Sequence, residues 1–274
     1  MTDETYAARV TDHYAPDDLR AVFLDVLGAW GKEDGPLTPA DLAPIDQFHV
    51  GGRAATLALA GLAALAPTDR VLDLGGGFGG PARTIADAYG CTVTVLDLTA
   101  AYCAVGELLT TRVGLGDRVS FRQGDALAAP FPDASFDLVW TQHSSMNIAD
   151  KRGLYTESAR LLRPGGRLAL YEIMAGDGRP PHYPVPWARD PAISFLQPVA
   201  TIRAILAELG FHETIWEELP PPRPAAPAPD AAPATPPPGL QLVLGDDFLA
   251  RARNMGRNLA EGRIALVRAI LTRP

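Results

Sequence analysis

The chain has 274 residues, of which 47% are hydrophobic, and its formal net charge is −8 at pH 7. This length and apolar content are enough for one large domain or two small ones with buried cores. Because non-specific nucleic-acid binding depends on clustered Lys and Arg, the acidic balance argues against a nucleic-acid partner. The two cysteines, Cys91 and Cys103, have no CxxC spacing or His cluster beside them, so we expect buried thiols and no metal site.

Residues 1–66 are predicted to form a helical lid. The apolar positions of residues 17–31 have the spacing of an amphipathic helix that ends at a glycine. Residues 37–42 are expected to form a short turn, and a second helix is predicted over residues 53–66. The first residues lack a basic stretch followed by an apolar core, and no apolar run approaches the roughly 18 residues that span a membrane. We therefore expect a cytoplasmic protein without a membrane partner.

Residues 71–80 predict a strand that runs into a glycine-rich turn before a helix. Such a turn lets a nucleotide approach the backbone closely. Gly75, Gly77 and Gly80 have the G-x-G-x-x-G spacing of NAD(P)-binding proteins, so an oxidoreductase is a competing prediction. Asp73, however, lies inside the strand, where its charge would repel a pyrophosphate and attract a cation.

Further strands are predicted in chain order. The second covers residues 92–96 and ends in Asp97, whose carboxylate is suited to ribose hydroxyls in either nucleotide class. The third begins at Val119 and leads to a Gly-Asp turn, where Asp125 is placed to accept from an adenine amine. Residues 135–140 predict the fourth strand, and the motif LLRPGG precedes the fifth.

In this order and spacing, the motifs VLDLGGGFGG, VTVLDL, GDA, SFDLVW and LLRPGG resemble those of the class I S-adenosylmethionine-dependent methyltransferases, over about residues 45–217. The resemblance implies an α/β fold with a doubly wound, Rossmann-like sheet that is mostly parallel, its last strand antiparallel, and an N-terminal helical lid. It also implies S-adenosylmethionine as the cofactor. The residues predicted to bind this cofactor are Asp73, Gly75, Gly76, Gly77, Gly79, Asp97, Leu98, Asp125, Ala126 and Gln142.

Two side chains at strand ends are the candidate catalytic residues. His143 follows the fourth strand and Glu172 ends the fifth, and the family's strand order makes these strands neighbours. The pair is suited to general-base catalysis, in which Glu172 orients His143 and His143 takes a proton from an acceptor hydroxyl. A neutral amine acceptor needs only positioning, so N-methylation is an alternative. Carbon methylation of a prenyl diphosphate is less favoured, because no compact Lys and Arg cluster is visible.

Other segments are predicted to contact the methyl acceptor. The resemblance brings lid residues near it, the end of the fourth strand faces the methyl group, and a proline-rich loop after the fifth strand carries two aromatic side chains. Ordinary packing is the alternative for each of them. The predicted acceptor contacts are Tyr14, Gln47, His49, Met146, Tyr183 and Trp187.

The C-terminal part is predicted to complete the sheet. A helix over residues 199–209 and a strand over 211–216 precede residues 220–238, which are rich in proline and alanine and are expected to form a flexible insertion. A helix is predicted over residues 246–259. Residues 263–271 fit either a helix or a strand, and the family's fold favours a strand antiparallel to the fifth. The predicted helix adds a wall near the acceptor through Phe248, Leu249 and Met255.

The sequence therefore predicts methyl transfer from S-adenosylmethionine to a hydroxyl or amine of a small molecule, giving S-adenosylhomocysteine. The competing predictions are an NAD(P)-dependent oxidoreductase and a module that binds S-adenosylmethionine without catalysis. Whether the chain forms a homo-oligomer is left open. The predicted parts are a lid (1–66), a cofactor-binding core (67–219), the insertion (220–238) and a closing helix and strand (239–274).

Overall fold

A computed structural model describes residues 19–32, 34–221 and 247–273 of the chain. Tyr14 and nearly all of the predicted insertion lie outside these residues, so their roles stay predictions. Among the described residues, no helix is long and apolar enough to cross a membrane.

The described residues build a sheet of seven strands in the order β3-β2-β1-β4-β5-β7-β6. The strands are β1 (Arg70–Leu74), β2 (Thr92–Asp97), β3 (Val119–Gln123), β4 (Phe136–Gln142), β5 (Leu162–Ala175), β6 (His212–Leu219) and β7 (Ile264–Thr272). Strands β1 to β5 pair in parallel, and β7 is antiparallel to both β5 and β6. The predicted α/β sheet is confirmed, and the ambiguous residues 263–271 form its antiparallel last strand.

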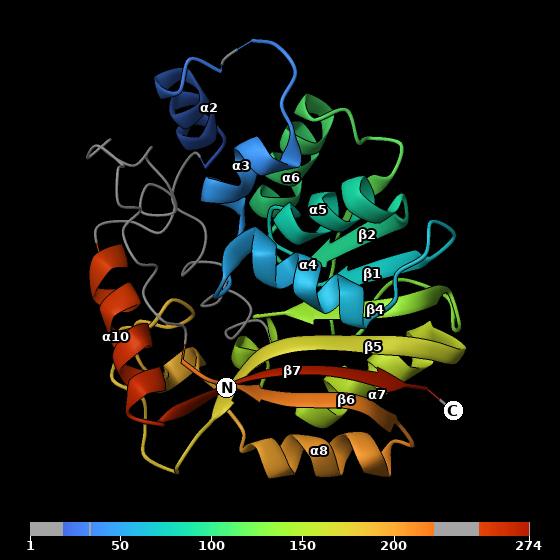
Figure 1. Cartoon of the computed structure of the whole chain (residues 1–274), viewed down its shortest axis with the longest axis vertical. Coiled ribbons are helices and arrows are strands. Elements are labelled where there is room, and N and C mark those ends of the chain that lie inside the picture. The colour runs from blue at the N-terminus through green and yellow to red at the C-terminus, as the bar shows by residue number, and fades with distance from the viewer. Residues whose placement is uncertain (1–18, 33, 222–246, 274) are drawn as a thin grey trace.

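Helices cover both faces of this sheet (Figure 1). They are α2 (Leu19–Ala29), α3 (Pro39–Asp46), α4 (Gly52–Leu62), α5 (Gly80–Tyr89), α6 (Ala100–Arg112), α7 (Lys151–Leu161), α8 (Val199–Glu208) and α10 (Phe248–Ala260). Val71 of β1 packs in the core shared with α4, α5 and α10, whereas Leu72 packs in the core shared with α7 and α8. This alternation is expected, because successive strand side chains point to opposite faces of a sheet.

The predicted turn at residues 37–42 is wrong, because helix α3 begins there. The side chain of Thr38 accepts a hydrogen bond from the backbone of Asp41, and the Asp41 side chain accepts one from the backbone of Thr38. This reciprocal capping box stabilises a helix N-terminus, and Pro39 is suited to the first helical turn.

Helix α4 is shorter than predicted. It ends at Leu62 rather than Ala66, and Ala64 just beyond it has a positive φ of 49°, which no helix residue adopts. Helix α2 is joined to the rest of the described residues by a third apolar cluster. In this cluster the ring of Phe23 lies 4.7 Å from the ring of Phe78, in the glycine-rich turn after β1. Helix α2, which belongs to the predicted lid, therefore packs directly on the glycine-rich turn.

Candidate functional site

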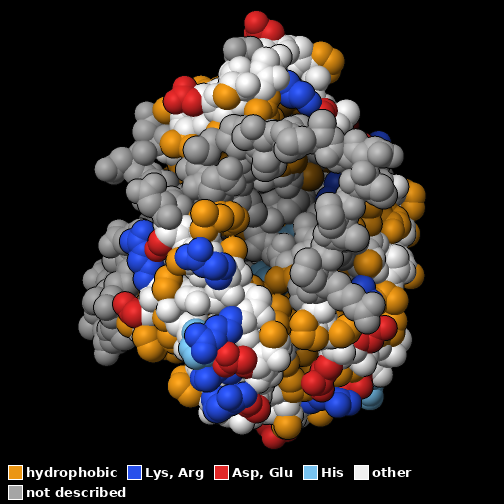
Figure 2. All heavy atoms as spheres, turned by 60° about the vertical axis from the view of Figure 1, so that its left-hand side comes forward, with side chains coloured by type: hydrophobic (Ala, Val, Ile, Leu, Met, Phe, Trp, Pro, Cys, Tyr) orange, Lys and Arg blue, Asp and Glu red, His pale blue; other side chains and the backbone are white. Residues whose placement is uncertain are grey.

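A cavity of about 670 Å³ opens at the carboxyl ends of the parallel strands, where ligands bind in doubly wound folds. Figure 2 shows this face of the molecule hollowed, with histidine side chains in the depth of the hollow. One part of the wall, the strand-end half, consists of Asp73, Gly75, Gly76, Gly77, Asp97, Leu98, Asp125 and Ala126. Another part, the α10 half, consists of Met146, Ile148, Pro186, Trp187, Phe248, Ala252, Met255, Gly256 and Leu259. Gln142, His49 and His143 also line the cavity.

The carboxylate of Asp97 holds two backbone segments of the strand-end half in place. Its Oδ2 accepts a hydrogen bond from Gly77 N at 2.9 Å, and its Oδ1 accepts one from Thr99 N at 2.9 Å. The first contact fixes the glycine-rich turn, in which Gly77 has a φ of 57°. The second fixes the start of α6. Asp97 therefore stands at the junction of two loops and lines the cavity. Its contact with a ribose stays a prediction.

Asp73 is the most unusual titratable group of the cavity. It is 1% exposed, and neither carboxylate oxygen has a hydrogen-bond partner among the described residues. Burial, together with the nearby charge of Asp97, raises the pKa of Asp73 to about 8. A Cβ atom on Gly76 would lie 2.5 Å from Asp73 Oδ2, so only glycine fits against it. A buried carboxyl group without a partner is unfavourable, and a cationic ligand group in the cavity would relieve this.

Gln142 presents a second unpaired polar group. Its Oε1 accepts hydrogen bonds from Trp140 Nε1 at 3.0 Å and from Thr56 Oγ1 at 3.3 Å. Its Nε2 is buried and has no partner among the described residues. Since buried amide donors in native proteins are nearly always hydrogen-bonded, this donor favours a ligand acceptor in the cavity.

His143 is held by backbone groups on both sides of its ring. Its Nδ1 lies 2.9 Å from Tyr171 O, so Nδ1 carries the proton that it donates to this carbonyl. Its Nε2 accepts a hydrogen bond from Val50 N at 3.4 Å. The residue adopts a left-handed backbone with a φ of 53°. Burial and the neighbouring His49 lower the pKa of His143 to about 3, so the ring is neutral at pH 7.

His49 lies beside His143, with the two ring centroids 6.0 Å apart. Its Nε2 lies 2.9 Å from Gly52 O and 3.0 Å from Thr56 Oγ1, so Nε2 carries the proton. The lone pair is then on Nδ1, to which the described residues offer no hydrogen bond. Burial lowers the pKa of His49 to about 4. The cavity therefore contains two neutral imidazoles, whose hydrogen-bond partners assign the proton to Nε2 in His49 and to Nδ1 in His143.

The predicted pairing of Glu172 with His143 is not what the structure forms. Glu172 is fully buried, and its carboxylate accepts hydrogen bonds from Ser145 N at 3.2 Å, from Ser145 Oγ at 2.8 Å and from Ser144 N at 3.4 Å. The reason is strand geometry. The ring of Tyr171 packs 4.8 Å from that of His143, and the next side chain along β5 points to the opposite face of the sheet. Glu172 instead anchors the turn that carries Met146.

Four other predicted contacts lie away from the cavity wall. Gly79 precedes α5 and leaves space for the ring of Phe121. Gln47 is buried and donates to Asp46 Oδ1 at 3.1 Å. Tyr183 is half-buried against the apolar core. Leu249 is 65% exposed on α10. Each is explained by packing or local hydrogen bonds, the alternative that the sequence left open.

Helix α10 supplies more of the wall than predicted. Phe248 and Met255 line the cavity as expected, and Ala252, Gly256 and Leu259 complete the same helix face. These positions follow the spacing of one face of an α-helix. The spacing can be read in the sequence. Ala252 and Gly256 are small, however, and small residues on a helix face do not indicate a cavity wall in a sequence.

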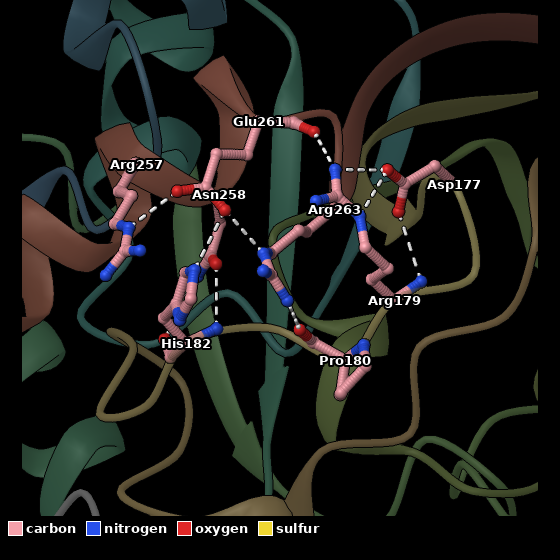
Figure 3. Close-up of polar contacts among 8 residues, drawn as sticks. All are labelled: Asp177, Arg179, Pro180, His182, Arg257, Asn258, Glu261 and Arg263. Atoms are coloured by element: carbon pink, nitrogen blue, oxygen red, sulfur yellow. Dashed lines mark hydrogen bonds and ion pairs between the residues drawn. The ribbon is translucent and has the colours of Figure 1, made fainter.

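A polar network joins α10 to the loop after β5 (Figure 3). Asn258 accepts from His182 N at 2.8 Å and donates to His182 O at 3.1 Å. Arg263 donates to Pro180 O at 2.8 Å and pairs with Glu261 at 2.6 Å, and Glu261 also lies 2.9 Å from His182 Nε2. Further along this loop, Trp187 is buried at the cavity wall. The network thus holds helix α10 against the loop after β5, and both of these segments line the α10 half of the cavity.

Comparison with known proteins matches a family model described as a methyltransferase domain to residues 72–170. A sterol 24-C-methyltransferase of Eremothecium gossypii is 34% identical over 180 residues, which cover 58% of this chain and 44% of that protein. Methyltransferase GfsG of Streptomyces halstedii is 34% identical over 175 residues, covering 62% of this chain and 60% of that protein. The chain thus spans about half the length of these curated relatives.

Among solved structures, geranyl diphosphate C-methyltransferase from Streptomyces coelicolor A3(2) superposes with a TM-score of 0.69 at 16% identity, covering 98% of each chain. That structure contains Mg²⁺, geranyl-S-thiolodiphosphate and S-adenosyl-L-homocysteine. At this identity, the likeness shows a shared fold.

Proposed function

Since this chain belongs to the class I S-adenosylmethionine-dependent methyltransferase family, we propose that it transfers a methyl group from S-adenosylmethionine to a hydroxyl or amine of a small molecule. When bound, S-adenosylmethionine supplies a methyl group activated by a sulfonium. The remaining work of such a site is to hold the donor, position the acceptor and exclude water. The described residues are suited to each of these tasks.

The observation that carries the proposal is the buried carboxyl group of Asp73, which faces the glycine-rich turn without a partner. S-adenosylmethionine has an α-ammonium and a sulfonium, and either would stabilise the ionised carboxylate. Asp97 would accept hydrogen bonds from the ribose hydroxyls and Asp125 one from the adenine amine, and both residues line the cavity. A pyrophosphate would gain no attraction from the protonated Asp73 and would oppose its ionisation, which disfavours the NAD(P) alternative.

The α10 half supports an acceptor with an apolar body. Its wall consists of aliphatic, aromatic and small side chains, including Met146, Trp187 and Leu259. Among the described residues that line the cavity there is no Lys or Arg. An acceptor that carries phosphate groups would need such cations or a metal, so the wall favours an acceptor without them.

The two histidines are suited to receive the proton that leaves a hydroxyl acceptor. Both are neutral at pH 7, because burial lowers their pKa values to about 4 in His49 and about 3 in His143. The contact between His143 Nε2 and Val50 N is 3.4 Å long, hence weak and easily exchanged for an acceptor hydroxyl. Such weak bases take the proton late, once the acceptor oxygen has begun to bond to the methyl carbon and has become more acidic.

Calorimetric titration with S-adenosylmethionine, S-adenosylhomocysteine and NADH, followed by transfer of a labelled methyl group to hydroxyl and amine acceptors, tests this function. We expect binding of the first two ligands, no binding of NADH, and label in the acceptor. Binding without transfer to any acceptor would instead support a non-catalytic module, and binding of NADH alone would overturn the proposal. In the variants His143→Gln and His49→Gln, loss of turnover with a hydroxyl acceptor but not with an amine would identify the base.

A further inference from the structure

Helix α10 presents a face of mixed side-chain size to the cavity. Phe248, Met255 and Leu259 on this face are large, whereas Ala252 and Gly256 are small. The two small residues are four positions apart, so they lie one helical turn from each other on the same side. Both are exposed, whereas Met255 and Leu259 are buried in the apolar core. The small pair therefore borders the open volume of the cavity.

Among the described residues, nothing requires glycine at position 256. Gly256 lies in the interior of α10 with a helical backbone, and it is not among the glycines with a positive φ. A Cβ atom built on it would meet no atom within 4 Å among the described residues. Glycine destabilises a helix interior relative to alanine. Its small size is thus unexplained by folding, and the space that it leaves belongs to the cavity.

Hydrogen bonds join α10 to the loop after β5, which restricts movement of the helix away from a larger ligand. Asn254 donates to Pro184 O at 2.9 Å, and Asn258 is hydrogen-bonded to both backbone groups of His182. Trp187, on the same loop, is 1% exposed and donates from Nε1 to Ser194 Oγ at 2.9 Å. A rigid wall transmits the size of a single side chain directly to the cavity.

We propose that Ala252 and Gly256 set the size limit of the acceptor chamber, and that the acceptor is a bulky, uncharged, largely apolar molecule such as a polycyclic or macrocyclic alcohol. This inference rests on the proposed function, because it names the acceptor of that reaction. The apolar walls and the lack of Lys and Arg among the described lining residues support a neutral, largely apolar ligand.

Binding of the uncharged polycyclic dye Nile red, whose fluorescence rises in apolar surroundings, tests the proposal without requiring turnover. Wild type, Gly256→Leu, Gly256→Ala and Ala260→Leu are each saturated with S-adenosylhomocysteine and titrated with the dye. Ala260 is the matched control, because it lies exposed on the same helix and does not line the cavity. The dissociation constant of S-adenosylhomocysteine is measured in parallel by calorimetry.

We expect Gly256→Leu to weaken dye binding at least tenfold, Gly256→Ala two- to threefold, and Ala260→Leu by less than twofold, with S-adenosylhomocysteine affinity unchanged in all three. Equal dye affinity in wild type and Gly256→Leu, or no saturable dye binding in wild type, would overturn the proposal. If Gly256→Leu fails to fold, Gly256→Ala tests the proposal instead, and dye affinity equal to that of wild type in this variant would overturn it. Failure of the proposed methyl transfer appears separately, as absence of label transfer by wild type.

Discussion

The strand-end half and the α10 half of the cavity are built in different ways. In the first, each polar group sits at the end of a parallel strand or in the turn directly after it, as Asp73, Asp97 and Asp125 do. In the second, the wall combines residues that lie far apart in the chain, from Met146 to Leu259, joined by side-chain contacts to loop carbonyls. One half depends on local backbone geometry and the other on tertiary packing.

This difference separates the two tasks of the site. The strand-end half presents carboxyl groups and backbone donors, which suit a polar ligand such as the proposed cofactor. The α10 half presents shape and apolar surface, which select a ligand by size more than by hydrogen bonding. Substitutions in one half are therefore expected to change binding in that half and to leave the other half unaffected, and the following predictions test this independence.

The largest effect is expected at Asp97. The Asp97→Ala variant loses the acceptor of Gly77 N and Thr99 N, together with the predicted ribose contact. Each hydrogen bond to a charged group contributes about 1.5–3 kcal/mol, so S-adenosylhomocysteine affinity should fall about 100-fold or more. Nile red binding to the α10 half should change less than twofold. Calorimetry and fluorescence titration measure the two affinities, and a parallel loss of both would contradict the independence of the halves.

Glu172 is expected to have a large effect on stability and little effect on the pH dependence of turnover. Glu172→Ala leaves the backbone donors of Ser144 and Ser145 unpaired in a buried place, which should lower the free energy of unfolding by about 2–4 kcal/mol. Glu213→Ala, which removes an exposed partner of Arg203, should cost less than about 1 kcal/mol. Urea denaturation gives both values.

The same Glu172 variant discriminates a positioning role from a catalytic one. Because Glu172 does not contact His143, the pH profile of the remaining turnover should keep its wild-type shape. A pH profile that shifts in Glu172→Ala would instead support the catalytic pair of His143 and Glu172 that the sequence predicted.

Ligand binding should release a proton from Asp73. Its pKa is raised from the ordinary value of 3.8 to about 8, so the free protein holds this proton at pH 7, and a bound cation favours the ionised form. We expect release of about one proton per S-adenosylhomocysteine at pH 7, and affinity that rises with pH up to about 8. His49 and His143 do not interfere, because their pKa values of about 4 and 3 keep them neutral in this range.

Calorimetry in buffers of different ionisation enthalpy counts the protons. Asp73→Asn should release none, and release unchanged in that variant would refute the assignment. The contribution of Asp73 to folding stability changes with pH in the opposite direction to its contribution to ligand affinity. A raised pKa in the folded state stabilises the free protein at low pH, and this contribution is lost as pH rises through about 8.

The sequence was a good guide to the strand-end half and a poor one to the contacts beyond it. Asp73 and Asp97 were predictable because their positions follow from the order of strand, turn and helix. The hydrogen-bond partner of Glu172 was not predictable, because the face toward which its side chain points depends on strand register. The backbone carbonyl of Tyr171, not the carboxylate of Glu172, accepts the hydrogen bond from His143 Nδ1. The turn predicted at residues 37–42 is wrong for a local reason, because Thr38 and Asp41 form a capping box that begins helix α3.

The smallest effect is expected at Gly256, where the sequence offered no functional signal at all. Gly256→Ala should raise the free energy of unfolding by about 0.5–1 kcal/mol, a rise of roughly 1–4 °C in Tm, because the added methyl group meets no described neighbour within 4 Å. Gly61→Ala on α4 is the matched control. Its Cβ would make only an ordinary contact with Tyr89 at 3.9 Å, and Gly61 does not line the cavity.

Both alanine variants should therefore be stabilised alike in thermal denaturation, and only Gly256→Ala should lose affinity for Nile red. Stabilisation without loss of dye affinity at position 256 would mean that this glycine is merely a weak point of the helix. A paired gain in stability and loss in binding would mean that α10 gives up helix stability to leave room for its ligand.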